Sequence, residues 1–106
     1  MNPYILKTDL YQLTLTAGYF HAGLADKVVT CEAFARKLPP TRRFMVMAGT
    51  EEIRKTLLEL RFDDDDIEFL VNEVPALKNV MTDNFIKWLK EFRFDGDMWA
   101  CLLYTS

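Results

Sequence analysis

The stretch TDLYQLTLTAGYFH, residues 8–21, predicts a helix from about Asp9 to His21. Thr8 or Asp9 can cap its N-terminus, and Gly23 stands where a left-handed residue commonly ends a helix. Apolar side chains recur in this stretch at helical spacing, so we expect one face of the helix to be buried. The members of this stripe are Leu10, Leu13, Ala17, Phe20 and Leu24.

Tyr11 follows the first position of that stripe, so the helix turns its ring about 100° away from the expected core. Leu15 and Tyr19 continue its line, and Gly18 lies on the same side. A glycine inside a helix costs roughly 1 kcal/mol relative to alanine, which indicates close approach by another group. A flat ring beside such a gap can stack on a planar heterocycle. The alternative is that Tyr11 only widens the core face, and spacing alone favours this alternative.

Residues 27–37, KVVTCEAFARK, predict a strand after the helix. Pro39 and Pro40 end this strand, because proline has no N–H to donate to a ladder. Side chains alternate between two faces along such a segment. One face carries Val29, Cys31, Ala33 and Ala35, and the other carries Val28, Thr30, Glu32, Phe34 and Arg36.

A basic cluster follows the predicted strand, in a chain whose formal net charge is −3. Arg36, Lys37, Arg42 and Arg43 fall within eight residues. Guanidinium groups suit phosphate because their planar fork binds it through two hydrogen bonds. A solvated loop tip would carry the same charges, so the residues by themselves leave both interpretations open.

The rest of the chain predicts three helices between two further strands, and this order indicates an α+β fold. A short segment, 44–48, reads as a strand or as the lead into a helix that opens at Gly49-Thr50. Two more helices begin after Asp63 and near Thr82, and a strand is expected over 98–104. The expected core positions of the three helices are Ile53, Leu57 and Leu60, then Ile67, Leu70 and Val71, then Phe85, Trp88, Leu89 and Phe92.

Four consecutive aspartates, residues 63–66, raise the question of a Ca²⁺ site. An EF-hand loop requires alternating ligands, a central glycine and a closing glutamate, and the spacing here provides none of them. Asp63 is instead expected to cap a helix whose first turn favours the following acidic residues.

Composition excludes several classes of function. A pI of about 5.1 argues against a nucleic-acid partner held by bulk charge, and no apolar stretch is long enough to span a membrane. The N-terminus lacks the pattern of a signal peptide, and two cysteines, Cys31 and Cys101, form no secreted disulfide framework. We therefore expect a cytoplasmic protein. His21, the one histidine, has no partner nucleophile nearby in the sequence and is not expected to be catalytic.

Several short motifs occur in a fixed order along the chain. They are TDLYQLT at 8–14, GYF at 18–20, FARKLP at 34–39, AG at 48–49, LRF at 60–62, DDIEFL at 65–70, Phe85, Trp88-Leu89, and FDGD at 94–97. In order and spacing, over roughly residues 4–100, these motifs together resemble the N-terminal part of nicotinate phosphoribosyltransferases.

This resemblance implies an enzyme that joins nicotinate to phosphoribosyl pyrophosphate with ATP hydrolysis, giving nicotinate mononucleotide in NAD salvage. It also implies a partial N-terminal α+β domain of a type II phosphoribosyltransferase, without the barrel domain. The family enzyme is implied to be a homodimer in which this segment reaches the active site of the other subunit. Tyr11 matches the tyrosine that stacks on the pyridine ring. Arg36 matches an arginine that holds the donor phosphates, with Lys37 as a weaker neighbour. No catalytic residue and no ligand for Mg²⁺ or ATP is expected within the chain.

The last residues depart from the resemblance, so we expect a domain fragment over 1–100 and an atypical tail over 101–106. Such a fragment is expected to have no turnover alone. The alternatives are a fragment of a related nicotinamide or quinolinate phosphoribosyltransferase, or a non-catalytic module that binds another protein through its aromatic line and basic tip. Neither a nucleic acid nor a membrane is expected as a partner.

Overall fold

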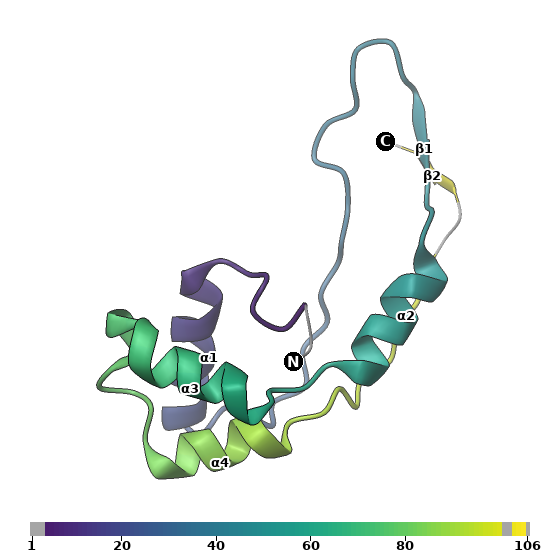
Figure 1. The fold of residues 1–106 in the computed structure, drawn as a ribbon. Coiled ribbons are helices and arrows are strands. Elements are labelled where there is room, and N and C mark those ends of the chain that lie inside the picture. The colour runs from purple at the N-terminus through teal and green to yellow at the C-terminus, as the bar shows by residue number, and fades with distance from the viewer. Residues whose placement is uncertain (1–3, 101–102, 106) are drawn as a thin grey trace.

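The computed structural model describes residues 4–100 and 103–105 and places four helices and two short strands in them. The helices are α1 (Leu10–His21), α2 (Thr50–Glu59), α3 (Asp64–Glu73) and α4 (Asp83–Glu91), with a 3₁₀ turn, η1 (Pro75–Leu77), before α4. The strands are β1 (Phe44–Val46) and β2 (Leu103–Thr105), which pair antiparallel with Met45 opposite Tyr104. Helices α1, α3 and α4 gather at one end of the molecule, and the strand pair lies at the other, beyond α2 (Figure 1).

The core lies where α1, α3 and α4 meet. Ala17 of α1, Ile67 of α3, and Phe85 and Leu89 of α4 are buried together. Apolar residues three and four positions apart on each helix make this possible, because they form one continuous face. Partly buried aromatic rings surround the cluster, and Phe20 and Phe85 have centroids 5.2 Å apart.

Local chemistry explains where the helices begin and end. Asp63 and Asp66 form a capping box at α3, and Thr82 Oγ1 accepts a hydrogen bond from Phe85 N at α4. Gly49 precedes α2 with φ of 81°, a conformation that strains residues with a Cβ. Gly23 has φ of 75° just after α1, as predicted. Asp9 occupies the N-cap position of α1, although its side chain makes no capping hydrogen bond.

The predicted strand over 27–37 is wrong. Residues 28–35 belong to neither a helix nor a strand, and they lie in a long arm that rises from α1 toward β1 (Figure 1). Val28 is 93% exposed and Phe34 is 60% exposed. A strand requires a backbone partner, and no such partner pairs with the segment among residues 4–100 and 103–105.

The predicted buried stripes are confirmed in part in α1 and α3, and the stripe predicted for α2 is not confirmed. In α1 the middle of the stripe packs on α4, but Leu10 and Leu24 at its ends are exposed, because they lie beyond the reach of the core. In α2 no residue is buried and Ile53 is exposed, because that helix lies apart from the other three (Figure 1). In α3 Ile67 and Leu70 are buried as predicted, whereas Val71 is exposed.

The described residues are mostly helical, and two strands of three residues each leave the predicted α+β class unconfirmed. The segment 44–48, expected as a strand or as the lead into a helix, forms the three-residue strand β1. The strand predicted over 98–104 is found only from Leu103, and residues 101 and 102 lie outside the described part of the chain. None of the described helices combines the length and the hydropathy that crossing a membrane requires.

Candidate functional site

Tyr11 lies on the first turn of α1 with its side chain directed to solvent. Its side chain is 56% exposed, and Leu15 and Tyr19, one and two turns further along, are exposed as well. The hydroxyl groups of Thr14 and Thr16 donate to the helix's own carbonyls, at 3.0 Å and 2.8 Å. The row through Tyr11, Leu15 and Tyr19 is therefore an exposed aromatic and aliphatic face on a helix.

No described neighbour explains why a glycine occupies position 18 on this face. A Cβ built at Gly18 meets no atom within 4 Å outside its own helix backbone and chain neighbours. The close approach that the sequence indicates therefore does not occur among the described residues. Open space beside the glycine leaves room for an external group next to Tyr19 and Tyr11.

The other end of α1 is anchored to the core. His21 Nε2 lies 2.8 Å from the carbonyl oxygen of Val80, and a carbonyl can only accept, so Nε2 is the donor. The His21 ring also lies 5.6 Å from the ring of Phe85 and 5.3 Å from that of Phe20. These contacts give His21 a structural role and hold the helix that carries Tyr11 at its C-terminal end.

Arg36 and Lys37 are exposed and lie in the arm between α1 and β1. The sequence placed Arg36 at the rigid end of a strand, but in the structure it lies in a bend of an irregular segment. The guanidinium group is free to meet an anion, yet no regular secondary structure holds it in position. The predicted contact with phosphate stays a prediction.

The other half of the basic cluster lies past the prolines. Arg42 N donates to Pro39 O at 2.9 Å, which closes a turn. Arg42 and Arg43 then line an open hollow of about 560 Å³ at the start of β1, together with Thr41, Phe44, Met45 and Val46. Arg36 and Lys37 are not part of its lining. The four cations therefore do not form one pocket.

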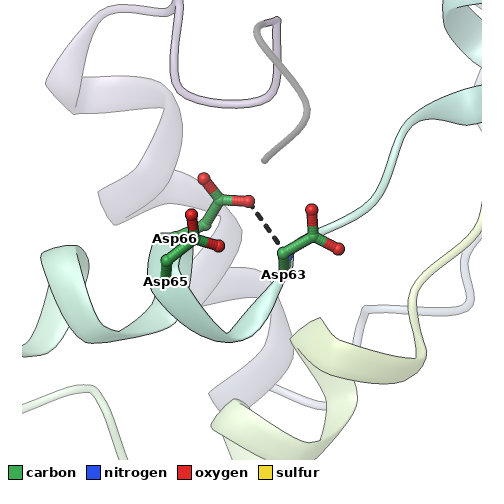
Figure 2. A group of neighbouring side chains, drawn as sticks. All are labelled: Asp63, Asp65 and Asp66. Atoms are coloured by element: carbon green, nitrogen blue, oxygen red, sulfur yellow. Dashed lines mark hydrogen bonds between the residues drawn. The ribbon is translucent and has the colours of Figure 1, made fainter.

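The acidic cluster at the start of α3 behaves as a helix cap (Figure 2). One carboxylate oxygen from each of Asp63, Asp65 and Asp66 lies within 4.8 Å of the others. Asp66 is fully buried and accepts from Asp63 N at 2.9 Å, and Arg61 Nε lies 3.1 Å from Asp63 Oδ1.

These contacts account for the predicted cap without an ion. The positive end of the helix dipole stabilises carboxylates and opposes a cation at the same place. Among residues 4–100 and 103–105, Asp66 Oδ1 has no hydrogen-bond partner, which is the one feature that the cap does not explain. The group does not fit a magnesium site, because Arg61 and the capping bond already engage Asp63 and Asp66.

Comparison with known proteins identifies the family to which the chain is similar. Residues 6–104 match the family model described as nicotinate phosphoribosyltransferase (NAPRTase) N-terminal domain. Nicotinate phosphoribosyltransferase pncB1 of Mycobacterium tuberculosis is 40% identical over 98 residues, covering 92% of this chain and 20% of the relative. The nicotinate phosphoribosyltransferase of Mus musculus is 37% identical over 70 residues, covering 66% of this chain and 13% of the relative.

A third relative, the nicotinate phosphoribosyltransferase of Bacillus subtilis, is 35% identical over 69 residues, 65% of this chain and 14% of its own length. The search of solved structures found no match. The chain thus spans about a fifth of the length of the mycobacterial relatives. With nearly all of its residues matched, the chain belongs to the family of nicotinate phosphoribosyltransferase N-terminal domains.

Proposed function

We propose that the chain is the N-terminal part of an enzyme that joins nicotinate to phosphoribosyl pyrophosphate, with ATP hydrolysis, to form nicotinate mononucleotide for NAD salvage. The family match over residues 6–104 carries this proposal. The relatives described above are named nicotinate phosphoribosyltransferase, which favours nicotinate over nicotinamide or quinolinate as the substrate. A chain that covers 13–20% of the length of these relatives supplies contacts to substrates, and turnover belongs to the whole enzyme.

Tyr11 is the residue that we assign to the pyridine ring. Its exposed ring, its position on a helix held at the far end by His21, and the open space beside Gly18 support this role. Stacking of two flat rings contributes about 0.5–1.5 kcal/mol beyond the burial of area. In a homodimer the exposed face of α1 would present Tyr11 to a ligand held by the other subunit.

Arg36 is the residue that we assign to the donor phosphates, with Lys37 in a weaker supporting role. An exposed guanidinium group offers two parallel N–H donors to phosphate oxygens, which an ammonium group does not. The irregular backbone around Arg36 implies that other parts of the enzyme must fix its position.

Ribosyl transfer passes through a sugar with the character of a cation, so catalysis depends on position and charge. A stacked Tyr11 would hold the nicotinate nitrogen in line with the sugar carbon, and Arg36 would offset charge on the departing pyrophosphate. Mg²⁺ and ATP belong to the proposal for the whole enzyme. The acidic cluster of α3 does not fit a metal, so we assign no residue of this chain to either of them. A reducing, cytoplasmic location is also part of the proposal and agrees with the low cysteine count.

One experiment tests whether the 106-residue chain has turnover by itself. Nicotinate mononucleotide formation is measured with the 106-residue chain, nicotinate, phosphoribosyl pyrophosphate, ATP and Mg²⁺. We expect no product above background, and detectable turnover would contradict the assignment of catalysis to the whole enzyme.

A second experiment tests the assigned ring. The tyrosine that aligns with Tyr11 is replaced by Ala and by Phe in a full-length relative. We expect the Ala variant to raise the KM for nicotinate about two- to tenfold, because the stacking energy is lost, and the Phe variant to retain most of it. Phe69→Ala at the aligned position is the matched control, since it removes an exposed ring from a different helix, α3. Unchanged KM and kcat in the Ala variant would remove the stacking role.

A further inference from the structure

A hydrogen bond between distant parts of the chain holds α1 at the end opposite to Tyr11. His21 Nε2 donates to the carbonyl oxygen of Val80 at 2.8 Å, and 59 positions separate the two residues in the sequence. Tyr11 lies on the first turn of the same helix. At a rise of 1.5 Å per residue, the two ends are about 15 Å apart along the helix axis. The direction that α1 takes at His21 therefore determines where the Tyr11 ring lies.

The packing of α1 is concentrated in its second half. Ala17 is the buried residue of this helix, and Phe20 packs beside it against the core. Leu10 and Tyr11 on the first turn are exposed, and Asp9 at the N-cap makes no side-chain capping hydrogen bond. The contacts that α1 makes with the core thus lie close to His21 and far from Tyr11.

The acceptor of the His21 hydrogen bond belongs to a turn that is itself well bonded. Val80 O also accepts from Thr82 N at 2.9 Å, and Val80 N donates to Leu77 O at 3.0 Å. Thr82 then caps α4, because its hydroxyl accepts from Phe85 N. The His21 ring lies 5.6 Å from the Phe85 ring, so a second contact joins α1 to the start of the same helix. Together the two contacts fix the direction of α1 relative to α4.

We propose that His21 is a positioning residue for the reaction: its hydrogen bond to Val80 sets the direction of α1 and thereby places the Tyr11 ring against nicotinate. This inference rests on the proposed stacking role of Tyr11. A rotation of α1 by about 4° at His21 moves a group about 15 Å away by about 1 Å. A misplacement of about 1 Å that originates far from the chemistry can cost about a hundredfold in rate. His21 thus acts through Tyr11 and touches no substrate itself.

The position of the donor atom distinguishes two amide variants. The amide nitrogen of glutamine can take a place close to that of histidine Nε2, whereas the side chain of asparagine is one carbon shorter. His21→Gln should therefore keep a donor for the carbonyl oxygen of Val80. His21→Asn and His21→Leu should lose it, and α1 should lose its fixed direction with it.

Steady-state kinetics test this role in a full-length relative that carries tyrosine, histidine and aspartate at the positions of Tyr11, His21 and Asp66. We expect His21→Leu and His21→Asn to raise the KM for nicotinate about two- to tenfold, up to the effect of Tyr11→Ala. The KM for phosphoribosyl pyrophosphate should not change, and His21→Gln should restore the KM for nicotinate. Asp66→Ala removes the cap of α3 instead, so it is the matched control for a loss of stability and should leave both KM values unchanged.

The double variant Tyr11→Ala/His21→Leu tests whether the histidine acts through the ring. We expect it to have the same KM for nicotinate as Tyr11→Ala, because no ring is left to be placed. An unchanged KM in Tyr11→Ala would remove the proposed function and this role with it.

Other outcomes would overturn the positioning role alone and leave the stacking role in place. These outcomes are a raised KM in Tyr11→Ala beside an unchanged KM in His21→Leu, multiplied effects in the double variant, and a KM that His21→Gln fails to restore. An equal rise of the nicotinate KM in Asp66→Ala would also overturn it, because loss of stability would then explain the effect.

Discussion

Replacement of Phe85 by alanine is expected to dismantle the cluster of α1, α3 and α4. Phe85 is only 2% exposed, and its ring lies 5.2 Å from that of Phe20 and 6.0 Å from that of Trp88. Phe→Ala replacements in protein cores cost about 3–5 kcal/mol, and the cost falls when neighbours can move into the cavity. Phe20 and Trp88 are only partly buried and have room to move, so we expect about 3 kcal/mol.

That loss is large for a core of this size. Folded domains are stable by about 5–15 kcal/mol, and a chain with so few buried side chains is expected near the lower end. The urea midpoint of the variant should therefore fall by more than half, because the midpoint is the free energy of unfolding divided by the slope m.

Fluorescence of Trp88 provides the measurement. Trp99 is 94% exposed, so Trp99→Phe removes a second signal with little expected effect on packing. Circular dichroism followed in the same titration tests whether unfolding is two-state. Phe69→Ala is the matched control, because Phe69 is exposed on α3, and it should cost well under 1 kcal/mol. Equal midpoints for the Phe85 and Phe69 variants would refute the reasoning that the three helices share one core at Phe85.

Three further predictions concern the helix starts. Asp66→Ala should lower the free energy of unfolding, measured by urea titration, by about 1 kcal/mol, because it removes the capping bond to Asp63 N. Asp65→Ala should lower it little. Equal effects of the two variants would contradict the capping role. Gly49→Ala should cost about 1 kcal/mol because φ of 81° strains a residue with a Cβ, and an unchanged midpoint would contradict that conformation. Arg54 donates to Glu51 at 2.9 Å and 2.6 Å and thereby lowers the pKa of the Glu51 carboxyl. The stabilisation by this pair is present above the ordinary pKa of glutamate and is lost as the pH falls through the lowered pKa of Glu51. Carbon NMR titration should show that Arg54→Ala raises the pKa of Glu51. An unchanged pKa would contradict the pairing.

Sequence reasoning succeeded where the structure depends on neighbours along the chain. The helix boundaries follow from capping residues such as Asp63 and Thr82, which satisfy N–H groups within the first turn of their own helix. The family could also be predicted, because short motifs keep their order and spacing without reference to packing.

Sequence reasoning also predicted some features of the candidate site and failed to predict others. Sequence spacing turned Tyr11 away from the buried stripe but by itself favoured a Tyr11 that widens the core face. The structure contradicts that alternative, because the side chain is exposed. The functional roles of Tyr11, Arg36 and Lys37 remain predictions, because each of them depends on a ligand. The expected strand end that was to hold Arg36 is absent.

Burial and strand pairing were decided by the tertiary structure alone. The α2 pattern predicts a buried face at Ile53, but a helix buries that face only if another element covers it. Residues 27–37 have a strand's alternation, but a strand forms only when a second backbone accepts and donates its hydrogen bonds. The sequence of this chain determined its helices, their caps and its family. The arrangement in space decided which apolar faces are covered and left residues 28–35 without a ladder partner among residues 4–100 and 103–105, because such contacts join residues far apart in the chain.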